Sequence, residues 1–316
     1  MINAVGLCGA NMGSSMPQIN AYRDRVSMRK IRPAFPAVTC TAQSNYLTGQ
    51  TPTEHGIVGN GWYHRELAEV HFWKQPNSVV QKEKIWEVMR RSHPEFTCAK
   101  MFWWYNMYST ADISVTPRPM YPADGRKCFD IYSFPYGVRP ELKKALGDFP
   151  FPTFWGPAAG QSTPQGSPDA VSRWIAESAK WVESRHHPDL NLIYLPHLDY
   201  NLQRLGPGHP EIGKDYERLD QIVGDLIQFF EREGVQVCLL SEYGISAVNR
   251  PIHLNREFRK KGWLTVKEEL GLEMLDYGQS RVFGVADHQV CHIYLNDPTI
   301  KNEVRDLVAG LDGVAN

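Results

Sequence analysis

The sequence predicts an α/β protein, a three-layer αβα sandwich around a mainly parallel central sheet. Short apolar runs bounded by polar turns occur at Leu190–Leu195, Val235–Leu240 and Gln289–Leu295, and such runs are typical of strands buried on both faces of a parallel sheet. Between the first two runs, apolar residues recur at helical spacing over Glu211–Glu233, and Gly234 follows as a common residue just past a helix end. Strand, crossover helix and strand form a βαβ unit, so we expect the first two runs to be central parallel strands.

The remaining elements fit one large domain. The chain has 316 residues, a length at which a single core stops growing, and we expect one domain over residues 1–316. Glu83–Arg91 and Pro168–Glu183 have the pattern of further helices that cover the sheet. Residues from about 102 to 168 are rich in Pro, Gly and aromatic residues. This density of turn residues predicts a loop-rich insert packed on the rim of the sheet.

Charge and hydropathy argue against several classes of protein. The 34 Lys and Arg residues balance 35 Asp and Glu residues, for a net charge of -1, which removes the electrostatic case for a nucleic-acid or anionic-membrane binder. No apolar run reaches the length of about 18 residues that spans a membrane. The amino-terminal residues lack a basic leader and a long apolar stretch, and the six cysteines form no C-x-x-C pair. We therefore expect a cytoplasmic protein with reduced thiols.

The stretch from Pro33 to Trp62 is the most informative for chemistry. After Pro36 a short extended step leads to Thr39, where a helix is predicted to begin, and Gly49 is predicted to end it. A hydroxyl at such a junction faces unpaired N–H groups and the positive end of the helix dipole, which favours a bound phosphate and a nucleophilic oxygen. Taken alone, the simpler interpretation, that Thr39 only caps the helix, is the better one.

The same stretch resembles the nucleophile region of the nucleotide pyrophosphatase/phosphodiesterase family, within the alkaline phosphatase superfamily. The family pattern [YF]-P-x-x-T, then T-G, then P-x-x-H-G-I-x-x-N is matched without gaps by Phe35–Thr39, Thr48-Gly49 and Pro52–Asn60. The resemblance implies an alkaline-phosphatase-like fold. It also implies that Thr39 is the transiently phosphorylated nucleophile and that Asn60 holds a phosphate oxygen.

Two later blocks resemble the metal-binding blocks of the family, with changes. In YLPHLDYNLQRLGP, Asp199 matches a metal-binding aspartate, but Gln203 stands where the family has a histidine. In LLSEYGI, Glu242 and Tyr243 replace the family's Asp-His pair. The family's early Asp-Gly turn is also missing, because the chain has Gly6-Leu7-Cys8-Gly9 after its first apolar run.

The resemblance implies a divalent metal cofactor, with zinc the expected ion, as one or two ions. The candidate ligands are Thr39, Asp199, Glu242 and His288, of which His288 is the late candidate and packing is its alternative role. Phosphoryl transfer needs charge neutralised at the phosphoryl oxygens and an activated nucleophile, which two metals normally supply. With several ligands replaced, two complete tetrahedral sites are not expected here.

Aromatic residues of the insert are candidate substrate-binding residues. Trp103, Trp104 and Tyr105 offer flat faces on which a nucleobase could stack, although burial against the core explains them at least as well. His197, two residues before Asp199, is a further candidate as a ligand, an acid or a support for the loop backbone. We expect a small phosphorylated substrate, and the sequence gives neither its identity nor the oligomeric state.

The sequence thus favours a metal-dependent phosphodiester or pyrophosphate hydrolase that works through a phosphothreonine. The altered metal ligands favour a second hypothesis, a catalytically weak or inactive superfamily member (a pseudoenzyme) that binds a phosphorylated ligand. A sulfatase is the third hypothesis. Cys40 and Ala42 fit its C-x-[PA]-x-R frame, but Ser44 stands where arginine is required.

Overall fold

The chain folds into two compact units. A computed structural model describes residues 1–164 and 166–315. Unit 1 contains Met1–Ile57 and Gln75–Ala247, and unit 2 contains Val58–Lys74 and the chain from Val248 onward. The single domain expected over the whole chain stays a prediction, and each unit is described by itself below.

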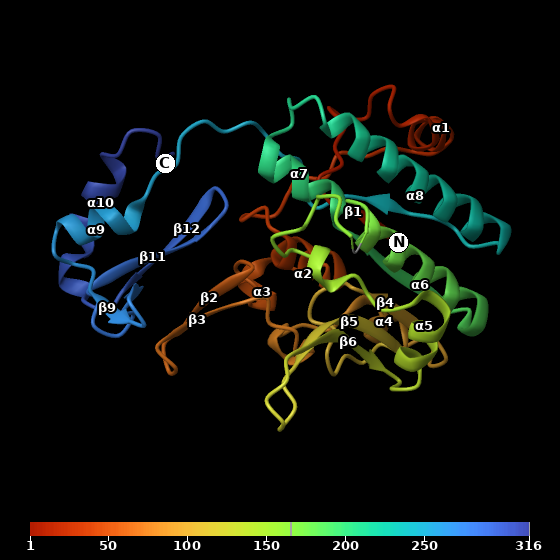
Figure 1. The fold of residues 1–316 in the computed structure, drawn as a ribbon, viewed down its shortest axis with the longest axis horizontal. Coiled ribbons are helices and arrows are strands. Elements are labelled where there is room, and N and C mark those ends of the chain that lie inside the picture. Colours follow the sequence, from red (N-terminus) through yellow and green to blue (C-terminus); the bar gives the residue numbers. More distant parts are fainter. Residues whose placement is uncertain (165, 316) are drawn as a thin grey trace. The chain divides into compact units, whose positions relative to one another are not determined.

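Unit 1 is built on a six-stranded sheet with the strand order β6-β5-β4-β7-β1-β8 (Figure 1). Five of these strands are parallel to their neighbours, and only β6 runs antiparallel, to β5. The α/β class with a mainly parallel sheet is therefore confirmed. The strands are β1 (Ile2–Ala4), β4 (Cys98–Met101), β5 (Ile113–Met120), β6 (Cys128–Phe134), β7 (Leu190–Leu195) and β8 (Leu239–Leu240).

Helices cover this sheet. The longest two, α6 and α8, pack against each other, and α6 also packs on β7 and β4 (Figure 1). The helices of unit 1 are α1 (Pro17–Arg25), α2 (Thr39–Thr48), α3 (Pro52–His55), α4 (Ile85–Met89), α5 (Val138–Leu146), α6 (Ala170–His186), α7 (His197–Leu205) and α8 (Ile212–Arg232), with short 3₁₀ turns η1 (Asn77–Val79) and η2 (Phe151–Thr153).

The three apolar runs predicted to be strands differ in where the structure places them. The run Leu190–Leu195 is the strand β7 and lies inside the sheet, as expected. The run Val235–Leu240 shortens to the two-residue strand β8, which pairs with β1 at the edge of the sheet, so the expectation that it is a central strand is wrong. The run Gln289–Leu295 becomes β12 in unit 2, where it pairs antiparallel with β11. The expectation that this third run joins the parallel sheet is wrong.

The segment 102–168 holds more regular structure than a loop-rich insert. It supplies β5 and β6, which form one edge of the sheet, and the helix α5, which packs on β6. The edge position agrees with a place on the rim of the sheet. Ile113 and Val115 of β5 and Ile131 of β6 are buried, and Pro117 and Pro119 of the proline-rich stretch lie within β5 itself.

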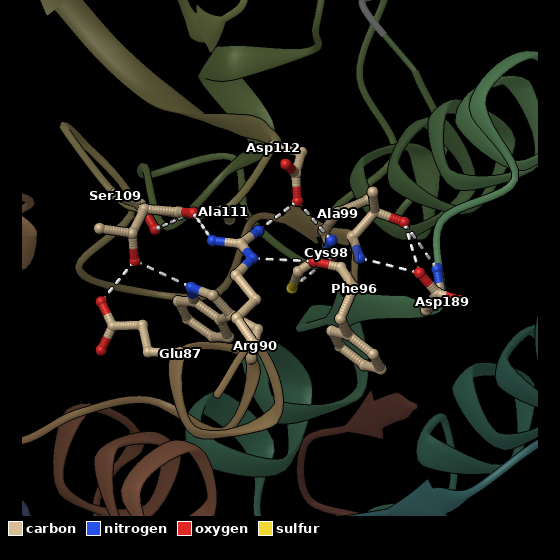
Figure 2. Close-up of polar contacts among 12 residues, drawn as sticks. Glu87, Arg90, Phe96, Cys98, Ala99, Ser109, Ala111, Asp112 and Asp189 are labelled. Carbon is tan, nitrogen blue, oxygen red and sulfur yellow. Dashed lines mark hydrogen bonds and ion pairs between the residues drawn. The ribbon is translucent and has the colours of Figure 1, made fainter. Parts of the chain in front are cut away.

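Side chains from three segments anchor the amino end of β4 (Figure 2). The Arg90 guanidinium donates to the carbonyl oxygens of Phe96, at 2.8 Å, and Thr110, at 2.7 Å, and to the Asp112 carboxylate at 2.5 Å. Asp112 in turn accepts from the Cys98 backbone N–H at 2.7 Å. These contacts fix where β4 begins relative to α4 and β5.

Unit 2 consists of small antiparallel sheets and two helices. Its elements are β2 (Gly61–His64), β3 (Glu69–Phe72), α9 (Leu254–Lys260), β9 (Val266–Glu269), β10 (Leu272–Leu275), β11 (Val282–Asp287), β12 (Val290–Leu295), the 3₁₀ turn η3 (Pro298–Ile300) and α10 (Lys301–Ala309). One core cluster forms around Phe258 and Val282, and a second around Tyr63 and Phe283.

Two further expectations concern cysteines and membrane spans. All six cysteines are free, but only Cys40 and Cys98 are buried and Cys238 is exposed, so the thiols are not uniformly core residues. Across the described ranges, none of the helices has the length and apolar character needed to cross a bilayer.

Candidate active site

Thr39 is the first residue of α2, and its hydroxyl does not cap that helix. The N-cap is Val38, in an extended conformation, and no side chain caps the helix start. The Thr39 hydroxyl instead contacts the Tyr243 hydroxyl at 3.3 Å. The simpler interpretation of Thr39 as a cap is thereby removed, and the hydroxyl is turned toward the chain that follows β8. At the other end, Gly49 stops α2 with φ of 65°, in the left-handed region that the sequence predicted for it.

Two buried carboxylates lie beyond the carboxyl ends of two parallel strands of the sheet, β7 and β8. Asp199 is in the first turn of α7, directly after β7, and Glu242 follows β8 by two residues. The strand β1 lies between β7 and β8. Parallel strands place such residues at one edge of a sheet, where α/β proteins bind ligands. Unit 1 therefore brings Thr39, Asp199 and Glu242 together around Tyr243.

Hydrogen bonds to Asp199 decide the direction of the Thr39 contact. The Asp199 Oδ2 atom accepts from Gln203 Nε2 at 2.7 Å and from the Tyr243 hydroxyl at 3.2 Å. A phenol has one proton to donate. With Tyr243 donating that proton to Asp199, the Tyr243 oxygen is available to accept from the Thr39 hydroxyl. The Thr39 proton thus starts a path through Tyr243 to Asp199.

Glu242 is held by two amides. Its Oε1 atom accepts from Asn3 Nδ2 at 2.6 Å and from Gln43 Nε2 at 2.7 Å. Gln43 belongs to α2, four residues after Thr39, and therefore lies on the same face of the helix. Neither Asn3 nor Gln43 was singled out from the sequence, although two signals were present: Asn3 interrupts the apolar run at the amino terminus, and Gln43 sits one turn past the candidate nucleophile.

Both carboxyl groups have raised pKa values. Burial raises the pKa of Glu242 to about 8, against smaller downward effects of the bonds from Gln43 and Asn3. Burial likewise raises the pKa of Asp199 to about 7, against the bonds from Tyr243 and Gln203. The donors that oppose burial are neutral side chains. The two carboxyl groups therefore share a dry site in which their charge is poorly compensated.

The donor atoms around Thr39 differ from those of a zinc pair. Asp199 Oδ1 and Glu242 Oε2 are buried and have no hydrogen-bond partner within the described part of the chain, and the same holds for Asn3 Oδ1. However, no three His, Cys, Asp or Glu side chains gather as a metal site among residues 1–164 and 166–315. The set around Thr39 consists of oxygen atoms only. Oxygen donors are the ligands of Mg²⁺, Mn²⁺ and Ca²⁺, whereas structural and catalytic zinc sites usually include nitrogen or sulfur.

Asn60 and His288 belong to unit 2. The Asn60 side-chain amide donates to Asp287 Oδ1 at 3.1 Å, and its backbone N–H donates to Asp287 Oδ2 at 2.8 Å. His288 lies in the turn between β11 and β12, and its Nε2 atom is 3.7 Å from Asp287. The family roles expected for these two residues stay predictions. Turnover of the variant Asn60→Ala is the measurement that checks the first of them.

The aromatic candidates are packed inside unit 1. Trp103, Trp104 and Tyr105 are all buried, and their positions agree with the alternative that they pack the segment against the core. His197 is buried at the start of α7 against Asp169 and Asp215, and burial lowers its pKa. Substrate contact by these four residues stays a prediction.

A cavity of about 660 Å³ adjoins the site within unit 1. Its walls are mostly apolar, with the basic residues Arg29 and Lys30 among them, and both Glu242 and Tyr243 line it. Its size is that of a small-molecule pocket. Glu242 and Tyr243 thus connect the surroundings of Thr39 to a cavity that a ligand could fill.

Comparison with known proteins assigns the family. The sequence model of the family "Type I phosphodiesterase / nucleotide pyrophosphatase" matches residues 3–312. The chain belongs to this family. An uncharacterized pyrophosphatase/phosphodiesterase of Schizosaccharomyces pombe is 23% identical over 236 residues, which is 72% of this chain and 40% of that protein. The chain therefore spans less than half the length of that relative.

Solved structures share the fold of this phosphodiesterase-family chain. Phosphonoacetate hydrolase from Sinorhizobium meliloti, in complex with phosphonoacetate, matches with a TM-score of 0.62 at 14% identity. The match covers 100% of this chain and 73% of the hydrolase chain. Murine ectonucleotide pyrophosphatase/phosphodiesterase 5 has a TM-score of 0.59 at 16% identity, with 99% and 69% coverage. The same murine protein was also solved as an inactive threonine-to-alanine variant in complex with AMP.

Proposed function

We propose that the chain is a phosphodiester or pyrophosphate hydrolase in which Thr39 is the nucleophile. The observation that carries this proposal is the position of the Thr39 hydroxyl, at the start of α2 and donating toward Tyr243 and Asp199. The helix start offers unpaired N–H groups to a phosphoryl group. Membership in the phosphodiesterase family supports the same reaction.

In this mechanism the Thr39 oxygen attacks phosphorus, and the bond between phosphorus and the leaving oxygen breaks. The proton of Thr39 moves to Tyr243 as the Tyr243 proton moves to Asp199. Asp199 is suited to accept it, because its pKa of about 7 lies near neutral pH. The leaving oxygen takes a proton from water. A water molecule then attacks the phosphorus, the bond between phosphorus and the Thr39 oxygen breaks, and a phosphate monoester is released, while the proton held by Asp199 returns to Thr39 through Tyr243.

We propose that one divalent cation assists this reaction. Asp199 Oδ1, Glu242 Oε2 and the Thr39 oxygen would hold it, since the two carboxylate oxygens are buried and have no partner among the described residues. The cation would supply positive charge to the phosphoryl oxygens and to the nucleophile. Because all of these donors are oxygen, we expect Mg²⁺ or Mn²⁺ in place of the zinc expected from the family resemblance.

The substrate is proposed to be a small phosphorylated molecule. Structural relatives were solved with phosphonoacetate and with AMP, and the cavity beside Glu242 and Tyr243 carries the basic residues Arg29 and Lys30. Cations at the wall of a pocket attract an anionic ligand. The mostly apolar remainder of the wall suits an organic group attached to the phosphate.

Trapping of the phosphorylated threonine tests the nucleophile. The chain is incubated with bis(p-nitrophenyl) phosphate and Mn²⁺, quenched in acid and digested. The peptide that contains Thr39 is then examined by mass spectrometry for a p-nitrophenyl phosphoryl group. Thr39→Ala should abolish both turnover and labelling. Thr41→Ala is the matched control, because Thr41 is equally buried on the same helix. Turnover that survives Thr39→Ala would remove Thr39 from the reaction.

A second candidate function is binding without hydrolysis. It is favoured by Gln203 and Tyr243, which occupy two positions of family metal ligands and are already hydrogen-bonded to Asp199. A chain that binds p-nitrophenyl phosphate in a calorimeter, yet gives neither label on Thr39 nor turnover with Mn²⁺ or Mg²⁺, would establish this function instead.

A further inference from the structure

Lys100 is a buried lysine that the proposed reaction does not use. It lies in β4, its side chain is 0% exposed, and its Nζ atom donates to the carbonyl oxygens of Trp104 at 2.7 Å and Tyr105 at 2.9 Å. Burying an amine in an apolar environment destabilises the fold unless its N–H groups donate hydrogen bonds. Lys100 donates hydrogen bonds to the carbonyl oxygens of two consecutive residues in the turn that follows β4.

The turn after β4 connects Lys100 to the site. The Trp104 backbone N–H donates to Gln43 Oε1 at 2.7 Å, and Gln43 Nε2 donates to Glu242 Oε1 at 2.7 Å. A backbone N–H can only donate, so it selects the oxygen end of the Gln43 amide. The nitrogen end of that amide is thereby turned toward Glu242.

We propose that Lys100 is a positioning residue, which orients the Gln43 amide through the Trp104 backbone and so fixes Glu242 beside Thr39. This inference rests on the proposed function of Glu242 as a cation-binding carboxylate. With Glu242 Oε1 committed to Gln43 and Asn3, the Oε2 atom is the one that remains for the cation. An unrestrained glutamine amide could present its oxygen to the carboxylate, which would repel it.

The turn needs this restraint because its backbone is unusual. Phe102 has φ of 64° and Tyr105 has φ of 56°, values in the left-handed region that side chains other than glycine rarely adopt. Such conformations persist only where the surroundings enforce them. The Lys100 amine enforces this one at the carbonyl oxygens of Trp104 and Tyr105, and Asn77 Nδ2 adds a bond to the Tyr105 carbonyl at 3.1 Å.

The strand β4, which contains Lys100, is itself held in place by side-chain contacts. Figure 2 shows the contacts of Arg90 and Asp112 that anchor the amino end of β4, two residues before Lys100. Burial lowers the pKa of Lys100 to about 7. Both the charged and the neutral amine keep at least two N–H donors, so the two bonds to the turn are available in either form.

The variant Lys100→Met tests the proposal, since it keeps an unbranched side chain and removes the donors. We expect its affinity for Mn²⁺, measured by titration calorimetry without substrate, to fall about tenfold, the size of one lost hydrogen bond to a charged group. Turnover of bis(p-nitrophenyl) phosphate should fall in kcat, with KM within about twofold. Lys84→Met is the matched control, because Lys84 is also buried but donates only to the Val80 carbonyl among the described contacts. Both parameters should stay within about twofold of wild type in the control.

A double-mutant cycle separates positioning from general packing. If Lys100 acts through Gln43, the variant Lys100→Met/Gln43→Ala should bind Mn²⁺ as weakly as Gln43→Ala alone, because the connection is already broken. Additive losses in the cycle would overturn the proposal. Should Lys100→Met fail to fold, Lys100→Gln retains one donor group and should show a smaller loss in the same cycle.

A structural readout keeps this test independent of the proposed function. Crystal structures of wild type and Lys100→Met should show the Gln43 amide leaving Glu242, and amide hydrogen exchange over residues 102–106 should become faster in Lys100→Met but not in Lys84→Met. A Gln43 amide still bonded to Glu242 in Lys100→Met would overturn the inference. If wild type neither binds Mn²⁺ nor turns over substrate, the proposed function fails, while these two measurements still decide on Lys100.

Discussion

At the scale of single residues, Tyr243 is the centre of the site. It stands where the family has a metal-binding histidine, and in this structure its hydroxyl connects Thr39 to Asp199. A neutral phenol brings no charge to the site, but its hydroxyl lies at hydrogen-bond distance from both Thr39 and Asp199. In the proposed reaction, Tyr243 therefore orients the Thr39 hydroxyl.

Removal of the Tyr243 hydroxyl should slow the reaction without unfolding the chain. In Tyr243→Phe the ring stays, while Thr39 loses its acceptor and Asp199 one of its donors. We expect kcat on bis(p-nitrophenyl) phosphate to fall about tenfold or more, as for loss of a hydrogen bond to a charged group. Tyr132→Phe, which removes a tyrosine hydroxyl that accepts from the Tyr108 backbone N–H outside the cavity, should leave kcat unchanged. Equal rates for wild type and Tyr243→Phe would exclude the proton path through Tyr243.

The residues of the site were partly readable from the sequence. Thr39, Asp199 and Glu242 were named, and the structure brings these three together in unit 1. Asn3 and Gln43 were missed, because an amide that orients a carboxylate has no spacing or composition of its own to reveal it. Its partner becomes visible only when distant strands are placed side by side.

At the scale of elements, α2 begins and ends where its sequence predicts. Gly49 ends it with φ of 65°, and a Cβ atom at this position would meet nothing within 4 Å. Substitution there is therefore a question of backbone conformation alone.

Gly49→Ala should destabilise the chain by about 1 kcal/mol, the cost of placing a Cβ atom in the left-handed region. Gly49→Asn should lose less, because asparagine tolerates this conformation. Urea denaturation of the two variants checks the order. If alanine is tolerated as well as asparagine, the end of α2 does not depend on the left-handed residue.

The strands show where reading the sequence reaches its limit. Leu190–Leu195 and Gln289–Leu295 are both short apolar runs, yet one is central in a parallel sheet and the other forms an antiparallel hairpin. An apolar run indicates a buried strand, but the pairing partner depends on the turn that precedes it. Here the turn at His288, with φ of 58°, returns the chain directly onto β11.

At the scale of the whole molecule, the two raised carboxyl pKa values make stability depend on pH. Burial raises the pKa of Glu242 to about 8 in the folded chain, against 4.5 for an exposed glutamate. Between these values the folded chain binds more protons than the unfolded one, so the free energy of unfolding falls as pH rises through this window. Asp199 contributes in the same sense.

The variant Glu242→Gln isolates this contribution. Compared with the variant, the metal-free wild type should lose up to about 1.4 kcal/mol per pH unit between about pH 5 and pH 8, as measured by urea denaturation at a series of pH values. Added Mn²⁺ should reduce this loss in wild type only, since it binds the ionised carboxylates. Parallel pH profiles for the two proteins would contradict the raised pKa of Glu242.

The strand that precedes Glu242 is also the shortest strand of the sheet. The edge strand β8 has two residues and pairs only with β1, while Glu242 is 2% exposed and Asp199 is 0% exposed. Short edge strands open at a small fraction of the free energy of global unfolding. Local unfolding of β8 therefore needs less free energy than global unfolding and would expose the two carboxylates. We expect a cation to bind slowly, at a rate set by this local unfolding, and to dissociate slowly.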